Sequence, residues 1–175
     1  MALSPPPDLL VIAASNGENL KLASRIAAQA EHQGHRAKVL DLTSLSLPLF
    51  TPLAKEAGMP DGVAPLHQQL MAATHWVICA PEYNGSIPPA FTSAVAWLSV
   101  QGDDFRSLFN GRPIAMASFS GGGGMGMSMS LRSQLSHLGA QVLGRQLMSN
   151  HAKPAKDESI RDLVHLLMQM QPLKL

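Results

Sequence analysis

Short apolar runs alternate with stretches of helical periodicity along this chain, and that alternation constrains the fold more than any other feature. Four runs are apolar throughout, as parallel strands buried on both faces are. They span residues 9–14, 75–80, 113–119 and 140–147, and a fifth, shorter run at 37–42 is expected nearer an edge. Helical spacing lies between them, over about 20–30, 65–73, 89–98, 127–138 and 157–170. The order predicts a doubly wound α/β sandwich with right-handed crossovers.

The domain organisation is expected to be simple. No internal repeat or linker interrupts residues 8–175, which we expect to form one domain, and residues 1–7, with three prolines, are expected to be a flexible tail. The one long irregular stretch, 47–62, contains three prolines and two glycines and is expected to be a functional loop or lid.

Charge and cysteine content restrict the class of protein. Charged residues make up 14% of the chain and the net charge is +1, which argues against a nucleic-acid-binding surface and suggests that another subunit covers part of the protein. No basic leader and no apolar run of bilayer length is seen, so neither secretion nor a membrane is expected. The single cysteine, Cys79, excludes an intrachain disulfide and fits a reducing cytoplasm. Within an apolar run, it is interpreted as a buried strand residue and not as a nucleophile.

Three unusual loops follow the first, third and fourth of the expected strands. Ligands of open α/β sheets bind beyond the carboxyl ends of the strands, so these loops could form one site. The first, "ASNGENLKLA" over 14–23, leads small polar residues into a helix N-terminus, where free backbone N–H groups favour an anion. Simple N-capping is the alternative. The loop is neither a Walker A sequence nor a G-x-G-x-x-G fingerprint.

The second loop belongs to "PEYNGSIPPAFTSAVAWLS", residues 81–99. Asn84-Gly85 is a strong turn signal, and prolines on both sides stiffen the chain. Such a loop can present backbone groups to a flat heterocycle, with Tyr83 as a wall, although an ordinary strand-to-helix connection is the alternative. The third loop, "SFSGGGGMGMSMS" over 118–130, contains four successive glycines, which allow close approach of the backbone to a ligand ring. A flexible linker is the alternative there.

On these loops, and above all on the 81–99 motif, the chain resembles the NADPH-dependent FMN reductase family, a flavodoxin-like group that includes quinone, azo-dye and chromate reductases. The likeness extends from Leu9 to about Leu147. It implies a flavodoxin-like, five-stranded parallel sheet of order 2-1-3-4-5 with helices on both faces. The first loop departs from the family pattern, because it is short and Asn16-Gly17-Glu18 stands where an arginine is common.

The resemblance also implies which residues bind the cofactor FMN. The first loop would hold the phosphate, mostly through backbone N–H groups, the second would border the isoalloxazine ring and ribityl chain, and the third would line the pyrimidine edge. The residues are Ser15, Asn16, Gly17, Glu18 and Asn19 in the first loop, Pro81, Glu82, Tyr83, Asn84 and Gly85 in the second, and Ser120, Gly121, Gly122 and Gly123 in the third. Members of the family form dimers or tetramers with the flavin near the subunit interface, and the helix that carries Trp97 is the expected contact.

The leading hypothesis is a cytoplasmic NAD(P)H oxidoreductase, homodimeric or homotetrameric, that binds neither nucleic acid nor membrane. NADPH or NADH would pass hydride to flavin N5, and the reduced flavin would reduce a quinone, free flavin, azo compound or similar acceptor. No catalytic side chain is expected, because the cofactor carries the chemistry. No metal is expected either, since six of the seven histidines, His151 among them, fall on expected helices or their ends without paired ligand spacing, and His75 opens a strand. Two alternatives stay open: a one-electron carrier of the flavodoxin type, and a binding or regulatory module with weak or no flavin binding.

Overall fold

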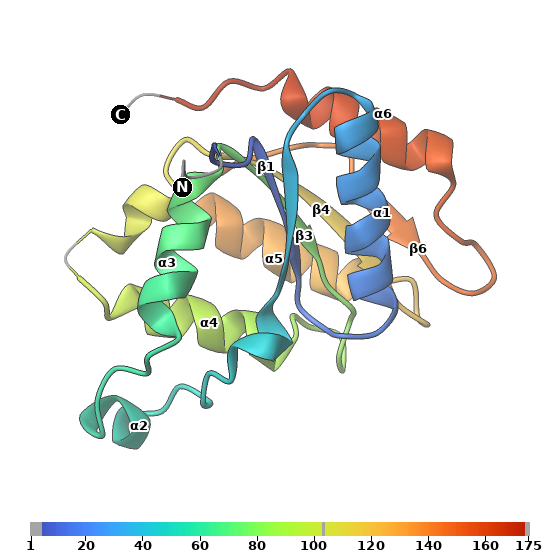
Figure 1. Cartoon of the computed structure of the whole chain (residues 1–175). Helices are drawn as coiled ribbons and strands as arrows, with labels where there is room; N and C mark the ends of the chain where they lie inside the picture. The colour runs from blue at the N-terminus through green and yellow to red at the C-terminus, as the bar shows by residue number, and fades with distance from the viewer. Residues whose placement is uncertain (1–4, 103, 174–175) are drawn as a thin grey trace.

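The structure is a computed structural model that describes residues 5–102 and 104–173, so part of the expected tail, residues 1–4, lies outside the described residues. One parallel sheet forms its centre, in the order β2-β1-β3-β4-β5, with β6 also paired to β4 (Figure 1). The order confirms the prediction. The strands are β1 (Leu9–Ala13), β2 (Ala37–Asp41), β3 (His75–Cys79), β4 (Pro113–Phe119), β5 (Gln141–Val142) and β6 (Leu147–Ser149).

Helices cover both faces of the sheet, as Figure 1 shows. Residues of β1 alternate between the two sides, so that Leu10 and Ile12 pack under α3, α4 and α5 while Leu9 and Val11 pack under α1 and α6. Both sides are apolar, which is why the strands are apolar throughout. The helices are α1 (Glu18–His32), α2 (Pro52–Glu56), α3 (Val63–Ala72), α4 (Pro89–Ser99), α5 (Met125–His137) and α6 (Asp157–Met168), with short 3-10 helices at Leu42–Leu45 and Phe105–Leu108.

Two sequence-based expectations about segments need correction. The run at 140–147, expected as one strand, divides into β5 and β6, which pair with opposite ends of β4. Between them the chain leaves the ladder after Leu143, and there Arg132 on α5 donates to the carbonyl oxygens of Leu143 at 3.0 Å and Gly144 at 3.4 Å. The stretch 47–62, expected to be irregular, contains α2, whose first turn is capped by the Thr51 hydroxyl at 3.0 Å from the Ala54 amide.

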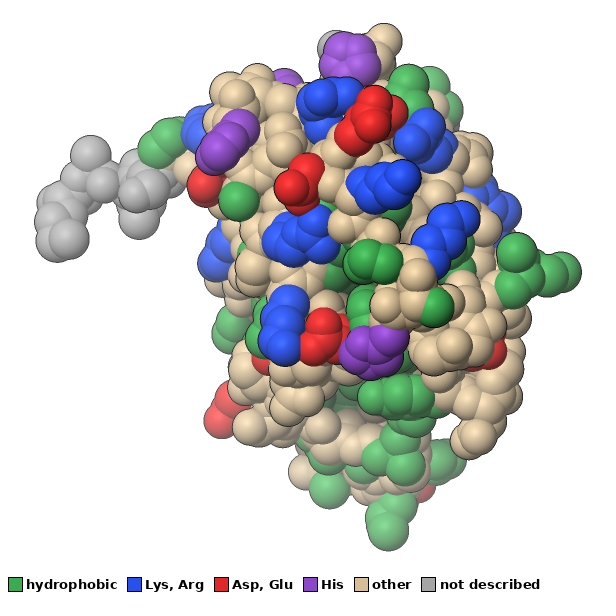
Figure 2. All heavy atoms as spheres, turned by 90° about the vertical axis from the view of Figure 1, so that its right-hand side faces the viewer, with side chains coloured by type: hydrophobic (Ala, Val, Ile, Leu, Met, Phe, Trp, Pro, Cys, Tyr) green, Lys and Arg blue, Asp and Glu red, His purple; other side chains and the backbone are tan. Residues whose placement is uncertain are grey.

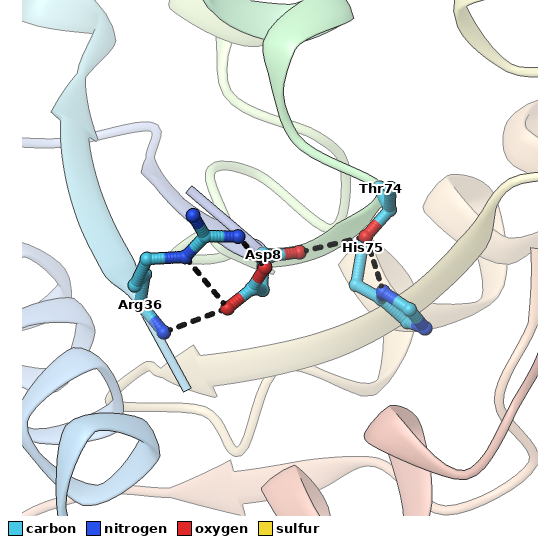
Figure 3. A network of polar contacts seen from close by, with 4 residues as sticks. All are labelled: Asp8, Arg36, Thr74 and His75. Carbon is cyan, nitrogen blue, oxygen red and sulfur yellow. Dashed lines mark hydrogen bonds and ion pairs between the residues drawn. The ribbon is translucent and has the colours of Figure 1, made fainter. Parts of the chain in front are cut away.

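A polar network ties the amino ends of the strands together (Figure 3). The Asp8 carboxylate accepts from the Arg36 guanidinium and, at 2.9 Å, from the Arg36 amide. The Asp8 carbonyl accepts from the Thr74 hydroxyl at 3.0 Å, and that hydroxyl lies 2.8 Å from Nδ1 of the buried His75. The hydrogen bonds from Arg36 lower the pKa of Asp8 to about 2. The network joins β1 to β2 and β3 at the end of the sheet where the amino ends of the strands lie.

The Asp8–Arg36 pair predicts a specific acid dependence of stability. Because the pKa of Asp8 is lowered on folding, its contribution is complete above about pH 4 and is lost as the pH falls towards 2. The pair is open to water, so Asp8→Asn is expected to cost about 1 kcal/mol of unfolding free energy at pH 6. Urea unfolding from pH 6 to pH 2 should show the difference between wild type and variant shrinking as the pH falls below 4 and largely lost at pH 2. A difference that stayed constant over this range would contradict the assignment.

No helix in the described part of the chain is long and apolar enough to cross a membrane.

Candidate functional site

Three loops meet at the carboxyl edge of the sheet, as predicted from their places after β1, β3 and β4. Backbone hydrogen bonds carry the ladder past the strand ends, from the Ala14 amide to the Cys79 carbonyl at 2.9 Å and from the Ala80 amide to the Ala117 carbonyl at 3.1 Å. The three loops therefore start side by side. A ligand at this edge can contact all of them at once.

The first loop offers its backbone to an anion. In the described ranges 5–102 and 104–173, the amides of Ser15, Asn16 and Gly17 donate to no protein group, and neither do those of Glu18 and Asn19, the first two of α1. Glu18 and Lys21 form an exposed ion pair at 2.6 Å, and the hydrogen bond from Lys21 lowers the pKa of Glu18. Because the two charges compensate each other, the attraction that this loop offers to an anion comes from the backbone N–H groups and the helix dipole.

Asn19, expected as a donor to the ligand, is used inside the protein. Its side chain is only 2% exposed and makes two hydrogen bonds to the backbone of Phe119 on β4. The Asn19 amide nitrogen donates to the Phe119 carbonyl at 2.9 Å, and the Phe119 amide donates to the Asn19 oxygen at 2.8 Å. The side chain thus joins the first turn of α1 to the end of β4 and fixes the first loop relative to the third.

The second loop is a tight hairpin. Tyr83 and Ser86 exchange two backbone hydrogen bonds of 3.1 Å each, and the turn between them is formed by Asn84 and Gly85 with φ of 50° and 76°. Positive φ at both central positions defines the primed turn that the Asn-Gly pair favours. The hairpin presents Tyr83, half exposed, at the edge of the site. Pro88 precedes α4 directly, and Pro89 is the first residue of that helix.

The third loop enters α5 through left-handed backbone. Gly123 and Gly124 have φ of 89° and 76°, conformations that residues with a Cβ rarely adopt. A Cβ on Gly124 would lie 2.7 Å from the hydroxyl oxygen of Ser118. Gly121 and Gly122 are exposed, with open space where a side chain would begin or, at Gly122, only the Glu82 carboxylate at 3.7 Å. The exposed glycines leave bare backbone at the edge of the sheet.

The second and third loops are joined directly. Glu82 donates from its amide to the Ser120 hydroxyl at 3.2 Å, and its carboxylate accepts from the Met127 amide at 3.1 Å. A Cβ on Gly126 would lie 2.5 Å from the Gly85 carbonyl oxygen, so glycine is what lets α5 pack against the hairpin. Gly126 was not among the predicted site residues, although its place in "GGGGMGMS", inside a helix, is a signal that could have found it.

Trp97 and His151 have contacts that the sequence did not show. Trp97, on the helix expected at a subunit contact, is fully buried, and its indole donates to the Pro48 carbonyl at 2.8 Å and packs edge-on against Phe50. It therefore holds the base of the 47–62 segment. His151, expected on a helix or at its end, lies in the loop after β6, with its ring centroid 4.9 Å from that of Phe119 beside the first loop. Only the tertiary structure brings it there.

Cys79 lies where the sequence placed it, inside β3. Its thiol is fully buried, and burial raises its pKa far above the usual range. A neutral buried thiol is a poor nucleophile.

The fold and the site define a flavodoxin-like protein with a ligand site at the carboxyl edge of its sheet. A model of the NADPH-dependent FMN reductase family matches residues 7–154, and the chain belongs to that family. The resemblance noted from the sequence is thereby confirmed. The cofactor is FMN, with NAD(P)H as the electron donor. Comparison with curated protein sequences finds no significant match.

Solved structures share the fold at low sequence identity. The flavoenzyme NAD(P)H:(acceptor) oxidoreductase FerB from Paracoccus denitrificans is 20% identical, with a TM-score of 0.75 over 94% of this chain and 96% of that one. An oxidoreductase from Corynebacterium diphtheriae is 16% identical, with a TM-score of 0.71 over 96% and 98%. A flavodoxin from the domain Archaea is 13% identical, with a TM-score of 0.62 over 93% and 94%. These similarities support the flavodoxin-like architecture.

The residues at the sheet edge fit FMN. Amides without protein partners at Ser15, Asn16 and Gly17 suit a phosphate, and the exposed glycine backbone together with Tyr83 suits the edge and face of a flat ring. Flavin-dependent oxidoreductase chemistry is therefore compatible with the groups present.

Proposed function

We propose that this flavin-dependent NAD(P)H oxidoreductase reduces a small acceptor of the quinone, free flavin or azo class, in the cytoplasm, as a homodimer or homotetramer. The observation that carries the proposal is the convergence of three loops with open backbone at one edge of the sheet. Bound FMN supplies the two-electron chemistry, accepting hydride from NAD(P)H and reducing the acceptor. The chain supplies position and exclusion of water, and no acid–base side chain is assigned to the reaction.

The binding roles we propose follow the geometry of the three loops. Backbone amides of Ser15, Asn16, Gly17 and Glu18 would hold the phosphate, and the 81–85 hairpin and glycines 121–123 would border the ring. Asn19 would act indirectly, by fixing the first loop against β4. Ser120 would likewise act on the hairpin, since its hydroxyl receives the Glu82 amide.

A hollow next to the site supports a small, largely apolar acceptor. Its volume is about 250 Å³, and it lies between the carboxyl end of β2 and the first turns of α4. Leu47 and Leu49 line one side and Pro89 and Ala90 the other. Because two of these residues belong to the 47–62 segment, we propose that this segment helps to select the acceptor.

The distribution of surface side chains agrees with a small-molecule substrate. On the face covered by α1 and α6, basic and acidic side chains are interspersed (Figure 2). Arg25 pairs with Asp157 at 2.6 Å and Arg145 with Asp162 at 3.4 Å, so this face lacks the uniform charge of a nucleic-acid interface.

The reductase proposal is tested by the absorbance spectrum of the purified protein with added FMN, followed by NADPH or NADH without oxygen. Bound flavin absorbance that bleaches with either nucleotide and returns on adding a quinone or azo compound supports it. Bleaching that no acceptor reverses would exclude the acceptor class. Colourless protein that neither binds FMN nor gains thermal stability from it would instead favour the binding-module alternative.

The subunit contact is expected at the projecting 47–62 segment, shown at the lower left of Figure 1 around α2. Leu49 and Leu53 are 67% and 77% exposed there, and α2 has no buried residue. Covering two leucines is worth several kcal/mol, so the double substitution Leu49→Asp and Leu53→Asp should weaken assembly by at least about a hundredfold. Light scattering after size exclusion measures the mass. Leu166→Asp, on the opposite helical layer, is the control, and an unchanged mass for the double variant would disprove the contact.

A further inference from the structure

Glu82 joins the two loops that border the proposed ring site through both its backbone and its side chain. Its backbone amide reaches the side chain of Ser120, and its side chain reaches the backbone of Met127, at 3.2 Å and 3.1 Å. Ser120 precedes the four glycines and Met127 follows them. A single residue of the hairpin therefore holds both ends of the glycine loop.

The Glu82 carboxylate also caps the N-terminus of α5, which has no capping residue of its own. The residue before α5 is Gly124, which has no capping side chain, and the first turn contains no acidic residue. The first amides of a helix need acceptors, and a negative charge beside them is favourable. Oε2 of Glu82 accepts from the Met127 amide, so a residue 45 positions earlier caps the helix.

Two glycines make room for this carboxylate. A Cβ on Gly126 would lie 3.0 Å from Oε2 of Glu82, and a Cβ on Gly122 would lie 3.7 Å from its other oxygen. The partly buried carboxylate thus lies between the glycine loop and α5. Apart from the hydrogen bond from the Gly123 amide to the Ser120 carbonyl at 3.0 Å, the four glycines have few internal ties, so anchoring their ends fixes their position.

We propose that Glu82 is a positioning residue that sets the separation between the 81–86 hairpin and the 120–124 glycine loop, and with it the width of the flavin slot. The second half of this statement rests on the proposed function, while the first concerns the protein without flavin. The role requires an acceptor oxygen at the right reach and does not require the negative charge.

The test compares Glu82→Ala, Glu82→Gln and Glu82→Asp with wild type. Glu82→Ala removes the acceptor. The hydrogen-exchange rate of the Met127 amide in flavin-free protein and the Kd for FMN should therefore both rise by at least about tenfold. Glu82→Gln keeps an oxygen at the same reach and should stay within about threefold of wild type in both. Glu82→Asp is one methylene short and should behave like the alanine variant. Glu158→Ala, which removes an acid from the first turn of α6, is the control and should change neither.

Each outcome decides a part of the proposal. An unchanged exchange rate of the Met127 amide in Glu82→Ala would show that Glu82 does not hold the two loops together. A glutamine variant as defective as the alanine variant would show that charge, and not reach, matters, and would also overturn the proposal. A changed exchange rate at Met127 with an unchanged Kd for FMN would refute the proposal that Glu82 sets the width of the flavin slot. If wild type bound no FMN while the Met127 exchange rate still changed as expected in the three variants, the role of Glu82 in joining the loops would stand and the proposed function would fail.

Discussion

Replacing Gly126 with valine is expected to destabilise the protein by about 3 kcal/mol and to raise the Kd for FMN more than about a hundredfold. Glycine inside a helix costs about 1 kcal/mol relative to alanine, so a residue with a Cβ would favour α5 by propensity alone. The contact opposes this gain, because the new Cβ would lie 2.5 Å from the carbonyl oxygen of Gly85. That oxygen belongs to a backbone held in a tight turn, so the hairpin must move, and overpacking outweighs propensity.

The measurement for Gly126→Val is urea unfolding without flavin, followed by FMN titration. Gly144→Val is the matched control, since a Cβ at Gly144 meets no atom within 4 Å and its φ is not left-handed. The control should unfold within about 0.5 kcal/mol of wild type. Wild-type stability and FMN affinity in Gly126→Val would show that α5 and the hairpin are not in contact as the structure has them.

Replacing Asn19 with leucine is expected to cost about 3 kcal/mol of unfolding free energy. Leucine has the same number and branching of side-chain heavy atoms, so the substitution leaves no cavity and the loss comes from hydrogen bonding. The substitution leaves both the amide and the carbonyl of Phe119 without their partners at a site where water has little access, and each unsatisfied group costs about 1–3 kcal/mol.

Urea unfolding of the flavin-free protein tests the Asn19→Leu prediction. Asn16→Ala, which changes an exposed side chain in the same loop, should shift the free energy by less than about 0.5 kcal/mol. If the two substitutions had equal effects, the buried amide would not be the tie between α1 and β4. The prediction concerns stability alone, so it holds whether or not flavin binds.

Much of the architecture could be predicted from the sequence. Helical spacing predicted α1, α3, α4, α5 and α6 to within a few residues, because periodicity reports directly which side of an element is buried. The Asn84-Gly85 turn was predictable for the same local reason, since few residues adopt positive φ. The three site loops followed from their positions after strands, and the 81–99 motif gave the family, which the match over residues 7–154 confirms.

Long-range partners could not be predicted in this way. Asn19 looked like a ligand donor, and no residue near Trp97 in the sequence pointed to a partner for its indole, but their hydrogen bonds go to Phe119 and Pro48, far away in the chain. Helical periodicity predicts that Trp97 lies on the buried face of its helix. It does not predict which segment packs against that face. The segment between β5 and β6 likewise bonds to Arg132 of α5, a partner that is invisible in the sequence of the 140–147 run itself.

The sequence by itself determined the elements, their buried faces and the three loops, because each depends on residues close together in the chain. The tertiary structure alone decided how these loops are fixed to one another. Asn19 and Glu82 are ordinary polar residues in the sequence, and they become ties between loops only when the sheet brings β1, β3 and β4 side by side. A polar side chain hydrogen-bonds to whatever group lies within about 3 Å of it, and folding determines which group that is.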